Sequence, residues 1–158
     1  MKNSLSFGKY ALFLLFFSAF AFASCKKAKG DEEKEPTKKE LLSNKWKVSD
    51  VKNKDGISII ALPIPQIVCL KDNIFTLKTD DSYSIDEGLE VCDPSTAGSG
   101  TWKLTDNETK IQFTPTTGDP LIFDFLEVNT TNLKIAYTIS GSGMPTADGK
   151  YTIILTKL

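Results

Sequence analysis

Histidine and arginine are both absent from this 158-residue chain. Histidine supplies most general acid–base chemistry near neutral pH and is the commonest metal ligand in proteins. Arginine supplies the bidentate contacts that hold carboxylates and phosphates. The usual Ser/His/Asp and Cys/His catalysts and most zinc sites are therefore excluded. Catalysis by two carboxylates needs neither residue, but the sequence singles out no such pair. We expect a protein that is not an enzyme and that holds no metal or cofactor.

The chain has one long hydrophobic run, residues 10–23, and its 14 residues are too few to cross a membrane as a helix. Lys2 and Lys9 precede this run, the small residue Ala23 ends it, and the small residue Ser24 follows. A basic start, a short apolar stretch and small residues at the end are typical of a secretory signal peptide. We expect residues 1–24 to be such a signal.

Cysteine is scarce, with three in the chain, and Cys25 comes directly after the expected signal. The sequence Phe22-Ala23-Ser24-Cys25 resembles the lipobox of bacterial lipoproteins, although Leu is usual where Phe22 stands. The resemblance implies cleavage before Cys25 and a lipid on its sulfur, because acyl chains gain ~0.8 kcal/mol per buried methylene. A secreted protein cut after Ala23, or an uncleaved anchor, is the alternative.

Residues 26–39 read KKAKGDEEKEPTKK and offer almost nothing for a hydrophobic core. Such a composition does not order itself. We expect residues 25–39 to be a lipidated cysteine followed by a flexible, charged tether that reaches ~45 Å when extended. The acidic run at 31–33 resembles surface-export signals of Bacteroidota lipoproteins. The expected location is the outer membrane, and the sequence leaves open whether the protein faces the periplasm or the cell surface.

The chain has no excess of basic over acidic residues. Without Lys2 and Lys9 of the signal, 17 lysines face 20 acidic residues, which gives a net charge of −3. Nucleic-acid binding requires a basic stripe. We therefore expect no nucleic-acid partner, and the sequence identifies no protein partner.

Cys69 and Cys92 are the two cysteines that remain once Cys25 carries a lipid. In the oxidising space outside the cytoplasm, two remaining cysteines favour a disulfide. Closing this loop would stabilise the fold by ~3 kcal/mol, mainly by restricting the unfolded chain. Two reduced cysteines in the core are the alternative.

Alternation of apolar and polar residues dominates from residue 44 onward, and this period of two predicts β-strands. The positions that share one face of each strand are Trp46, Val48 and Asp50; Phe75 and Leu77; Tyr83 and Ile85; Trp102 and Leu104; Ile111 and Phe113; Leu121, Phe123 and Phe125; Leu133, Ile135, Tyr137 and Ile139; and Tyr151, Ile153 and Leu155. Short turns rich in Asp, Asn, Thr and Gly connect several of these strands. The pattern predicts about eight strands, each antiparallel to the next.

Two segments depart from this pattern. Residues 39–43 are expected to form a single helical turn before the first strand. Residues 61–70 contain Pro63 and Pro65, which do not suit a central strand. We expect this segment to be a cover loop with a short helix.

Eight up-and-down strands, each with one apolar face, can close into an antiparallel barrel. A barrel of this size is either filled by side chains or holds one small ligand. A two-sheet β-sandwich is the alternative all-β fold, because alternation alone does not separate the two.

Several short motifs follow one another in a recognisable order. They are LLSNKW at 41–46, CLKDN at 69–73, DDSY at 80–83, Cys92, and GTWKL at 100–104. This order resembles that of the lipocalin-like lipoproteins of Bacteroidota and covers most of residues 41–158. Asn44 stands where lipocalins have Gly before the first-strand Trp46, and Lys157 is the only candidate for their late basic residue, which is usually Arg. The resemblance implies a lipocalin-like barrel over residues 40–158.

The resemblance also implies a scaffold for a small molecule. The candidate ligand-binding residues are the inward aromatics Trp46, Phe75, Tyr83, Trp102, Phe113, Tyr137 and Tyr151. Phe123 and Phe125 belong to the same inward set. The alternative is that these rings fill the core. The three tyrosines are the better candidates, because each pairs an apolar ring with a hydroxyl that needs a partner.

Two acidic segments, Asp80-Asp81 and Asp86-Glu87-Gly88, have the oxygen ligands that calcium prefers. Their spacing does not fit an EF-hand loop, so we expect turn residues on a solvated edge. Asp124 lies between Phe123 and Phe125 and is expected to point outward.

These observations predict a membrane-anchored, extracytoplasmic lipoprotein with a lipocalin-like domain. The domain would bind a small apolar or amphipathic molecule near residues 61–70. The alternative is a structural or interaction lipoprotein, accessory to a cell-envelope complex, with a filled barrel and no ligand.

Overall fold

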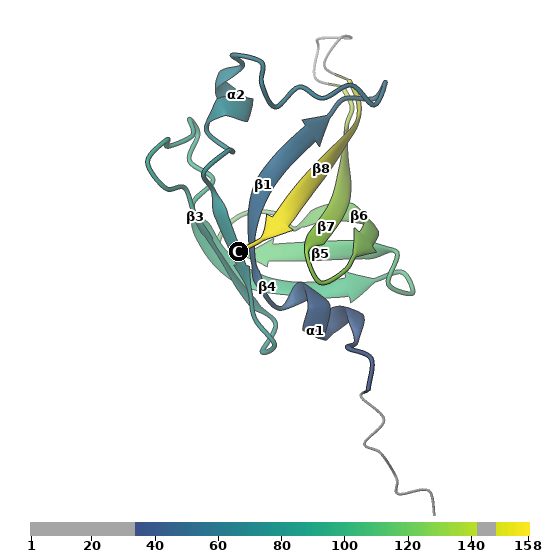
Figure 1. Ribbon diagram of the computed structural model, residues 1–158. Helices are drawn as coiled ribbons and strands as arrows, with labels where there is room; N and C mark the ends of the chain where they lie inside the picture. The colour runs from purple at the N-terminus through teal and green to yellow at the C-terminus, as the bar shows by residue number, and fades with distance from the viewer. Residues whose placement is uncertain (1–33, 142–147) are drawn as a thin grey trace, which may run out of the picture. The chain divides into compact units, whose positions relative to one another are not determined.

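Eight antiparallel strands form a closed barrel in the computed structural model, which describes residues 34–141 and 148–158 (Figure 1). The strands are Lys45–Lys52 (β1), Ile74–Leu77 (β2), Ser82–Asp86 (β3), Gly98–Thr105 (β4), Lys110–Pro115 (β5), Leu121–Val128 (β6), Asn132–Ile139 (β7) and Gly149–Lys157 (β8). Each strand pairs with the next, and β1 pairs with β8 from Trp46 opposite Lys157 to Lys52 opposite Thr152. The predicted barrel is confirmed, and the two-sheet sandwich is wrong because this last pairing leaves no open edge. The expected signal peptide and Cys25 lie outside the described residues.

Two short helices accompany the barrel within the described residues, and the first, Lys38–Leu42 (α1), begins earlier than expected. The backbone N–H of Glu40 donates to the Thr37 hydroxyl over 3.2 Å, and the Thr37 N–H donates back to the Glu40 carboxylate over 2.6 Å. This reciprocal capping box starts the helix at Lys38. The last residues of the expected tether therefore belong to the folded part of the chain. Figure 1 shows α1 beneath one end of the barrel.

The second helix, Pro65–Val68 (α2), lies in the connection between β1 and β2, here called the cover segment (residues 53–73). Proline suits the first helical position because its missing N–H has no partner there anyway. The sequence prediction of a cover loop with a short helix is confirmed. Figure 1 shows α2 at the end of the barrel away from α1.

A β-bulge in β1 changes which residues face the interior. The register of β1 against β8 shifts between Val48 and Asp50. An extra residue in one strand re-aims the side chains that follow it. Val51 is therefore buried, whereas Asp50 accepts a hydrogen bond from the Ser58 hydroxyl over 2.6 Å. The expectation that Asp50 shares the inward face of Trp46 and Val48 is wrong for this reason.

The packed core lies mainly toward the α1 end of the barrel. It contains Leu42, Trp46, Val48, Val51, Leu77, Tyr83, Trp102, Ile111, Leu133, Ile135 and Leu155. Both tryptophans are fixed by their indole N–H groups: Trp46 donates to the Leu42 carbonyl over 2.8 Å, and Trp102 donates to the Lys78 carbonyl over 3.1 Å. Buried indoles need such partners. This end of the barrel interior is therefore filled with side chains.

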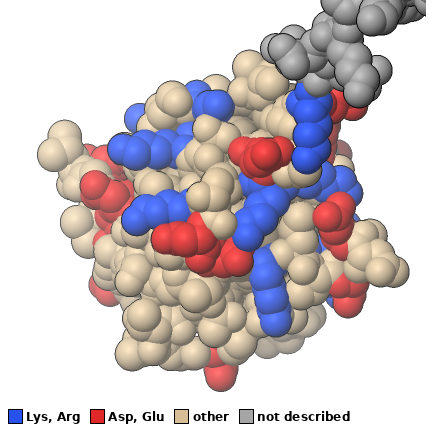
Figure 2. Space-filling view, turned by 90° about the horizontal axis from the view of Figure 1, so that it is seen from below, with Lys and Arg blue, Asp and Glu red and all other residues tan. Residues whose placement is uncertain are grey.

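Charges of both signs are interspersed on the outer surface, as Figure 2 shows for the face seen from below. Asp124 points outward as predicted and pairs with Lys150 over 2.7 Å. Exposed pairs of this kind contribute little to stability. Within the described residues, no helix has the length and apolar character needed to cross a bilayer.

Candidate functional site

An apolar cavity of about 500 Å³ lies at the end of the barrel away from α1 and is open to solvent. Its barrel wall consists of Val51, Phe123, Tyr137, Ile139, Tyr151 and Ile153. Val51 and Ile139 lie near the ends of β1 and β7, and Tyr151 lies near the start of β8. These positions place the cavity in the barrel mouth.

The cover segment supplies the rest of the wall through Ile59, Ile64, Ile67 and Leu70. Ile64 is the N-cap of α2, and Ile67 lies within its single turn. The turn is closed by backbone bonds from Val68 N–H and Cys69 N–H to the carbonyls of Ile64 and Pro65, over 2.9 and 3.2 Å. The cavity thus has one wall made of strands and one made of a connecting segment.

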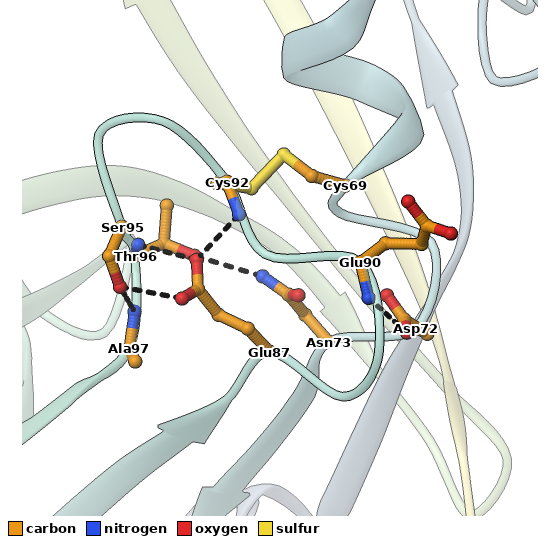
Figure 3. The surroundings of a disulfide bond; sticks show 9 residues. All are labelled: Cys69, Asp72, Asn73, Glu87, Glu90, Cys92, Ser95, Thr96 and Ala97. Atoms are coloured by element: carbon orange, nitrogen blue, oxygen red, sulfur yellow. Dashed lines mark hydrogen bonds between the residues drawn. A yellow bond between two sulfur atoms is a disulfide. The ribbon is translucent and has the colours of Figure 1, made fainter.

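A disulfide fixes the cover segment to the connection between β3 and β4, here called the rim loop (residues 87–97). Cys69, the C-cap residue of α2, is bonded to Cys92, and their Cα atoms are 5.1 Å apart (Figure 3). The predicted disulfide is confirmed. Because Cys69 is next to Leu70 of the cavity wall, the bond also holds that wall in place.

A buried carboxylate organises the rim loop from inside. Glu87 is only 6% exposed. Its oxygens accept hydrogen bonds from the Ser95 hydroxyl (2.5 Å), the Thr96 N–H (2.6 Å), the Thr96 hydroxyl (2.9 Å) and the Cys92 N–H (3.2 Å), a cluster drawn in Figure 3. These donors, the Ser95 hydroxyl most of all and then the Thr96 N–H, lower the pKa of Glu87 from 4.5 to about 2.

The expectation that Glu87 is a solvated turn residue is wrong. Four donors surround its carboxylate, and a buried charge needs such partners. The available signal was the Ser95-Thr96 pair just after Cys92, which brings two hydroxyl groups and a backbone N–H close to the carboxylate. Both oxygens of Glu87 accept hydrogen bonds from these donors. The residue therefore stabilises the conformation of the rim loop.

Asp72 joins the cover segment to the rim loop by a second route. Its Oδ2 accepts from the N–H groups of Leu89 and Glu90 over 2.7 and 3.1 Å, and these bonds, Glu90 first, lower the pKa of Asp72. Gly88 is required beside it, because its φ is +66° and a Cβ there would lie 2.6 Å from Asp72 Oδ2. Asn73 is fully buried, and its amide nitrogen, when turned toward the Cys69 and Glu87 carbonyls, lies 2.9 and 3.3 Å from them.

The CLKDN motif at 69–73 therefore has a physical explanation. Cys69 forms the disulfide, Leu70 lines the cavity, and Asp72 and Asn73 bind the backbone of neighbouring segments. The motif ties one wall of the cavity to the barrel.

The other acidic segment, Asp80-Asp81, is a turn as predicted. Asp80 Oδ1 accepts from the Ser82 N–H over 3.0 Å and from the Ser82 hydroxyl over 2.6 Å. These bonds, the hydroxyl first, lower the pKa of Asp80. Across the described residues, no group of three or more His, Cys, Asp or Glu side chains is placed to hold a metal ion.

The structure brings two of the seven predicted ligand-binding residues to the cavity wall, Tyr137 and Tyr151. Trp46, Tyr83 and Trp102 lie in the core instead, and burial raises the pKa of the Tyr83 phenol. The remaining two, Phe75 and Phe113, are partly buried and pack against the core.

A row of aromatic contacts connects the core to the cavity. Ring centroids are 5.2 Å apart for Tyr83 and Phe113, 5.8 Å for Phe113 and Phe123, and 5.2 Å for Phe123 and Tyr137. Phe123 and Tyr137 line the cavity, whereas Tyr83 lies in the core. The aromatic set thus divides into residues that fill the barrel and residues that line its mouth.

Sequence reasoning expected a ligand near residues 61–70 but named no aliphatic residue of the cavity wall as a ligand-binding residue. Val51 escaped notice because of the bulge in β1. Ile59, Ile64, Ile67 and Leu70 lie on a segment without strand alternation. The two prolines of that segment were the available signal, because they predicted a cover over the barrel.

One solved structure similar to this chain is that of a lipocalin-like protein from Bacteroides uniformis. The two share 14% sequence identity with a TM-score of 0.47, over 75% of this chain and 99% of the other. No protein-family model and no curated protein matches the chain.

Proposed function

We propose that this protein is a lipid-anchored component of the cell envelope that holds a small apolar or amphipathic molecule in its barrel mouth. Cys25 would carry the anchor in the outer membrane. The observation that carries the proposal is the open cavity of about 500 Å³ with an apolar wall. Ligand sites in proteins commonly have volumes of ~300–1,000 Å³ and predominantly apolar walls.

The two ends of the barrel interior differ in a way that supports binding at one of them. Core side chains and both tryptophans fill the end near α1. The mouth keeps open space between strands and cover segment. An apolar molecule that entered this space would gain ~25 cal/mol for each Å² of apolar surface removed from water.

Contacts within the protein hold the cavity wall in position in the absence of a ligand. The Cys69–Cys92 bond and the Asp72 hydrogen bonds attach the cover segment to the rim loop. A site whose walls are already in place loses less conformational entropy on binding. This rigidity favours a carrier that keeps its ligand.

A second candidate function is an accessory role in an envelope complex, and the rim loop supports it. Leu89 and Val91 are 94% and 68% exposed, although Asp72 and the disulfide hold the backbone around them. Apolar side chains presented on a fixed loop are typical of contact surfaces. We rank this function second because it leaves the cavity without a role.

Native mass spectrometry of the exported, mature protein (residues 25–158) tests the proposal. We expect an additional mass of a few hundred daltons that is lost on denaturation. Ile153→Trp, which fills the cavity, should abolish it, whereas Leu126→Trp on the outer face of β6 should retain it. A bare mass for wild-type protein and both variants would contradict ligand carriage and favour the accessory role.

A further inference from the structure

The cavity wall contains no charged side chain among the described residues. Eight of its ten side chains are Val, Ile, Leu or Phe, and the other two are Tyr137 and Tyr151. The phenol hydroxyls are therefore the polar groups that its side chains contribute. A hydroxyl can both donate and accept a hydrogen bond, but it does not neutralise a charge.

Two charged residues near the wall in sequence, Lys150 and Asp72, have partners outside the cavity. Lys150 precedes Tyr151 in β8, and alternate residues of a strand face opposite sides. Lys150 accordingly pairs with Asp124 on the outer surface over 2.7 Å. Asp72 follows Leu70 by two residues, but its Oδ2 binds two backbone N–H groups of the rim loop.

Lysine is the only basic side chain in this protein, so only a lysine could neutralise an anion in the cavity. Transfer of an unpaired ionised group into apolar surroundings is far more costly than transfer of a hydroxyl. The net charge of −3 for residues 25–158 adds a weak repulsion of anions. Each of these effects disfavours ligands that would bring a negative charge into the mouth.

We infer that the cavity selects electrically neutral molecules with an apolar body, and discriminates against anions of the same size and shape. A ligand hydroxyl or carbonyl could be hydrogen-bonded by Tyr137, which lines the cavity. The inference rests on the proposed function, because it names the class of molecule that the same cavity holds.

Two fluorescent probes with the same ring system provide a matched test. N-phenyl-1-naphthylamine is neutral, and 8-anilino-1-naphthalenesulfonate adds one sulfonate to that skeleton. Residues 25–158 carrying Cys25→Ser should be titrated with each, because an unlipidated chain avoids detergent micelles that bind the neutral probe. We expect the neutral probe to bind at least about tenfold more tightly. Ile153→Trp should remove this binding, and Leu126→Trp should preserve it.

A charge introduced at the rim of the cavity makes the test specific. Ile139 lines the cavity but is 36% exposed, so a lysine there can reach water. Ile139→Lys should strengthen binding of the sulfonate probe and reduce the difference in affinity between the two probes. Leu126→Lys, which places the same charge on the outer face of β6, should leave the difference in affinity between the two probes unchanged.

The outcomes separate the two proposals. Equal affinity for both probes, with both lost in Ile153→Trp, would overturn the selectivity and leave the binding function standing. Failure of both probes to bind wild-type protein would overturn the binding function itself, and the selectivity with it.

Discussion

The carboxylate of Glu87 accepts a hydrogen bond from the backbone N–H of Cys92 over 3.2 Å, so a buried charge and a disulfide fix the same residue. Through Cys69 this contact extends to α2 and to the apolar wall of the cavity. The electrostatics of the rim loop and the geometry of the cavity are therefore coupled.

The coupling predicts a specific dependence of stability on pH. The pKa of Glu87 is about 2 in the folded protein and 4.5 ordinarily, so the unfolded chain takes up this proton at higher pH. The contribution of Glu87 to stability is complete above about pH 4.5 and is lost as the pH falls toward 2. Urea unfolding at stepped pH should show a shallower decline across this window for Glu87→Gln than for wild type.

Glu90→Gln is the matched control for this measurement. Its exposed side chain belongs to the same loop, while its backbone N–H makes the contact with Asp72. The control should reproduce the wild-type pH dependence. Parallel curves for wild type and Glu87→Gln would contradict the assignment of this acid sensitivity to Glu87.

Loss of the disulfide should reduce both stability and ligand affinity. Cys69→Ser combined with Cys92→Ser frees a loop with a sequence separation of 23 residues and should lower the free energy of unfolding by ~3 kcal/mol. Affinity for the neutral naphthylamine should fall as well, because Ile64, Ile67 and Leu70 lose their fixed position. Urea unfolding and probe titration measure the two effects. Unchanged affinity in a folded double variant would show that the cover segment holds itself in place.

Two glycines of β4 should respond very differently to the same substitution. A Cβ on Gly100 would lie 2.1 Å from the Thr114 carbonyl oxygen and 2.8 Å from Pro115 Cα, whereas a Cβ on Gly98 meets nothing within 4 Å. Gly100→Ala must push β5 away from β4 and should cost about 3 kcal/mol. Gly98→Ala should change stability by less than about 0.5 kcal/mol. Thermal unfolding of the two variants measures both changes in stability. Equal losses of stability would refute the close approach of the β4 and β5 backbones at Gly100.

The membrane anchor is predicted to depend on one sulfur. Cys25→Ala should abolish incorporation of radioactive palmitate in growing cells and release the protein from the membrane fraction. The Cys69→Ser, Cys92→Ser double variant serves as the control, because it removes the other two cysteines and should remain labelled. Continued labelling of Cys25→Ala would refute lipidation at this residue.

The barrel could be predicted from the sequence because most strands follow a strict two-residue alternation. Leu133 and Ile135 in β7 both proved buried, as their spacing requires. The prediction failed at Asp50, since a bulge depends on how β1 pairs with β8, more than 100 residues away in sequence. Local periodicity contains no information about that pairing.

The cavity was harder to predict than the barrel. Aromatic residues were the reasonable candidates, but side-chain type does not show how far along the barrel a residue lies. Trp46 and Trp102 proved to be core residues with satisfied indoles, while Tyr137 lies at the mouth. Glu87 was misjudged for a related reason, because the hydroxyl groups that bind it come from a turn formed only in the folded loop.

Closure of the barrel by β1 and β8 affects how the protein can be made. The first and last strands pair over six residue positions, and the Leu158 N–H donates to the Lys45 carbonyl over 3.0 Å. A chain that stops before β8 would leave β1 and β7 with unpaired backbone groups along their length, and such edges recruit other chains. Synthesis must therefore pass β8 before the native backbone pairing can be completed, and a chain that stops before β8 would tend to aggregate.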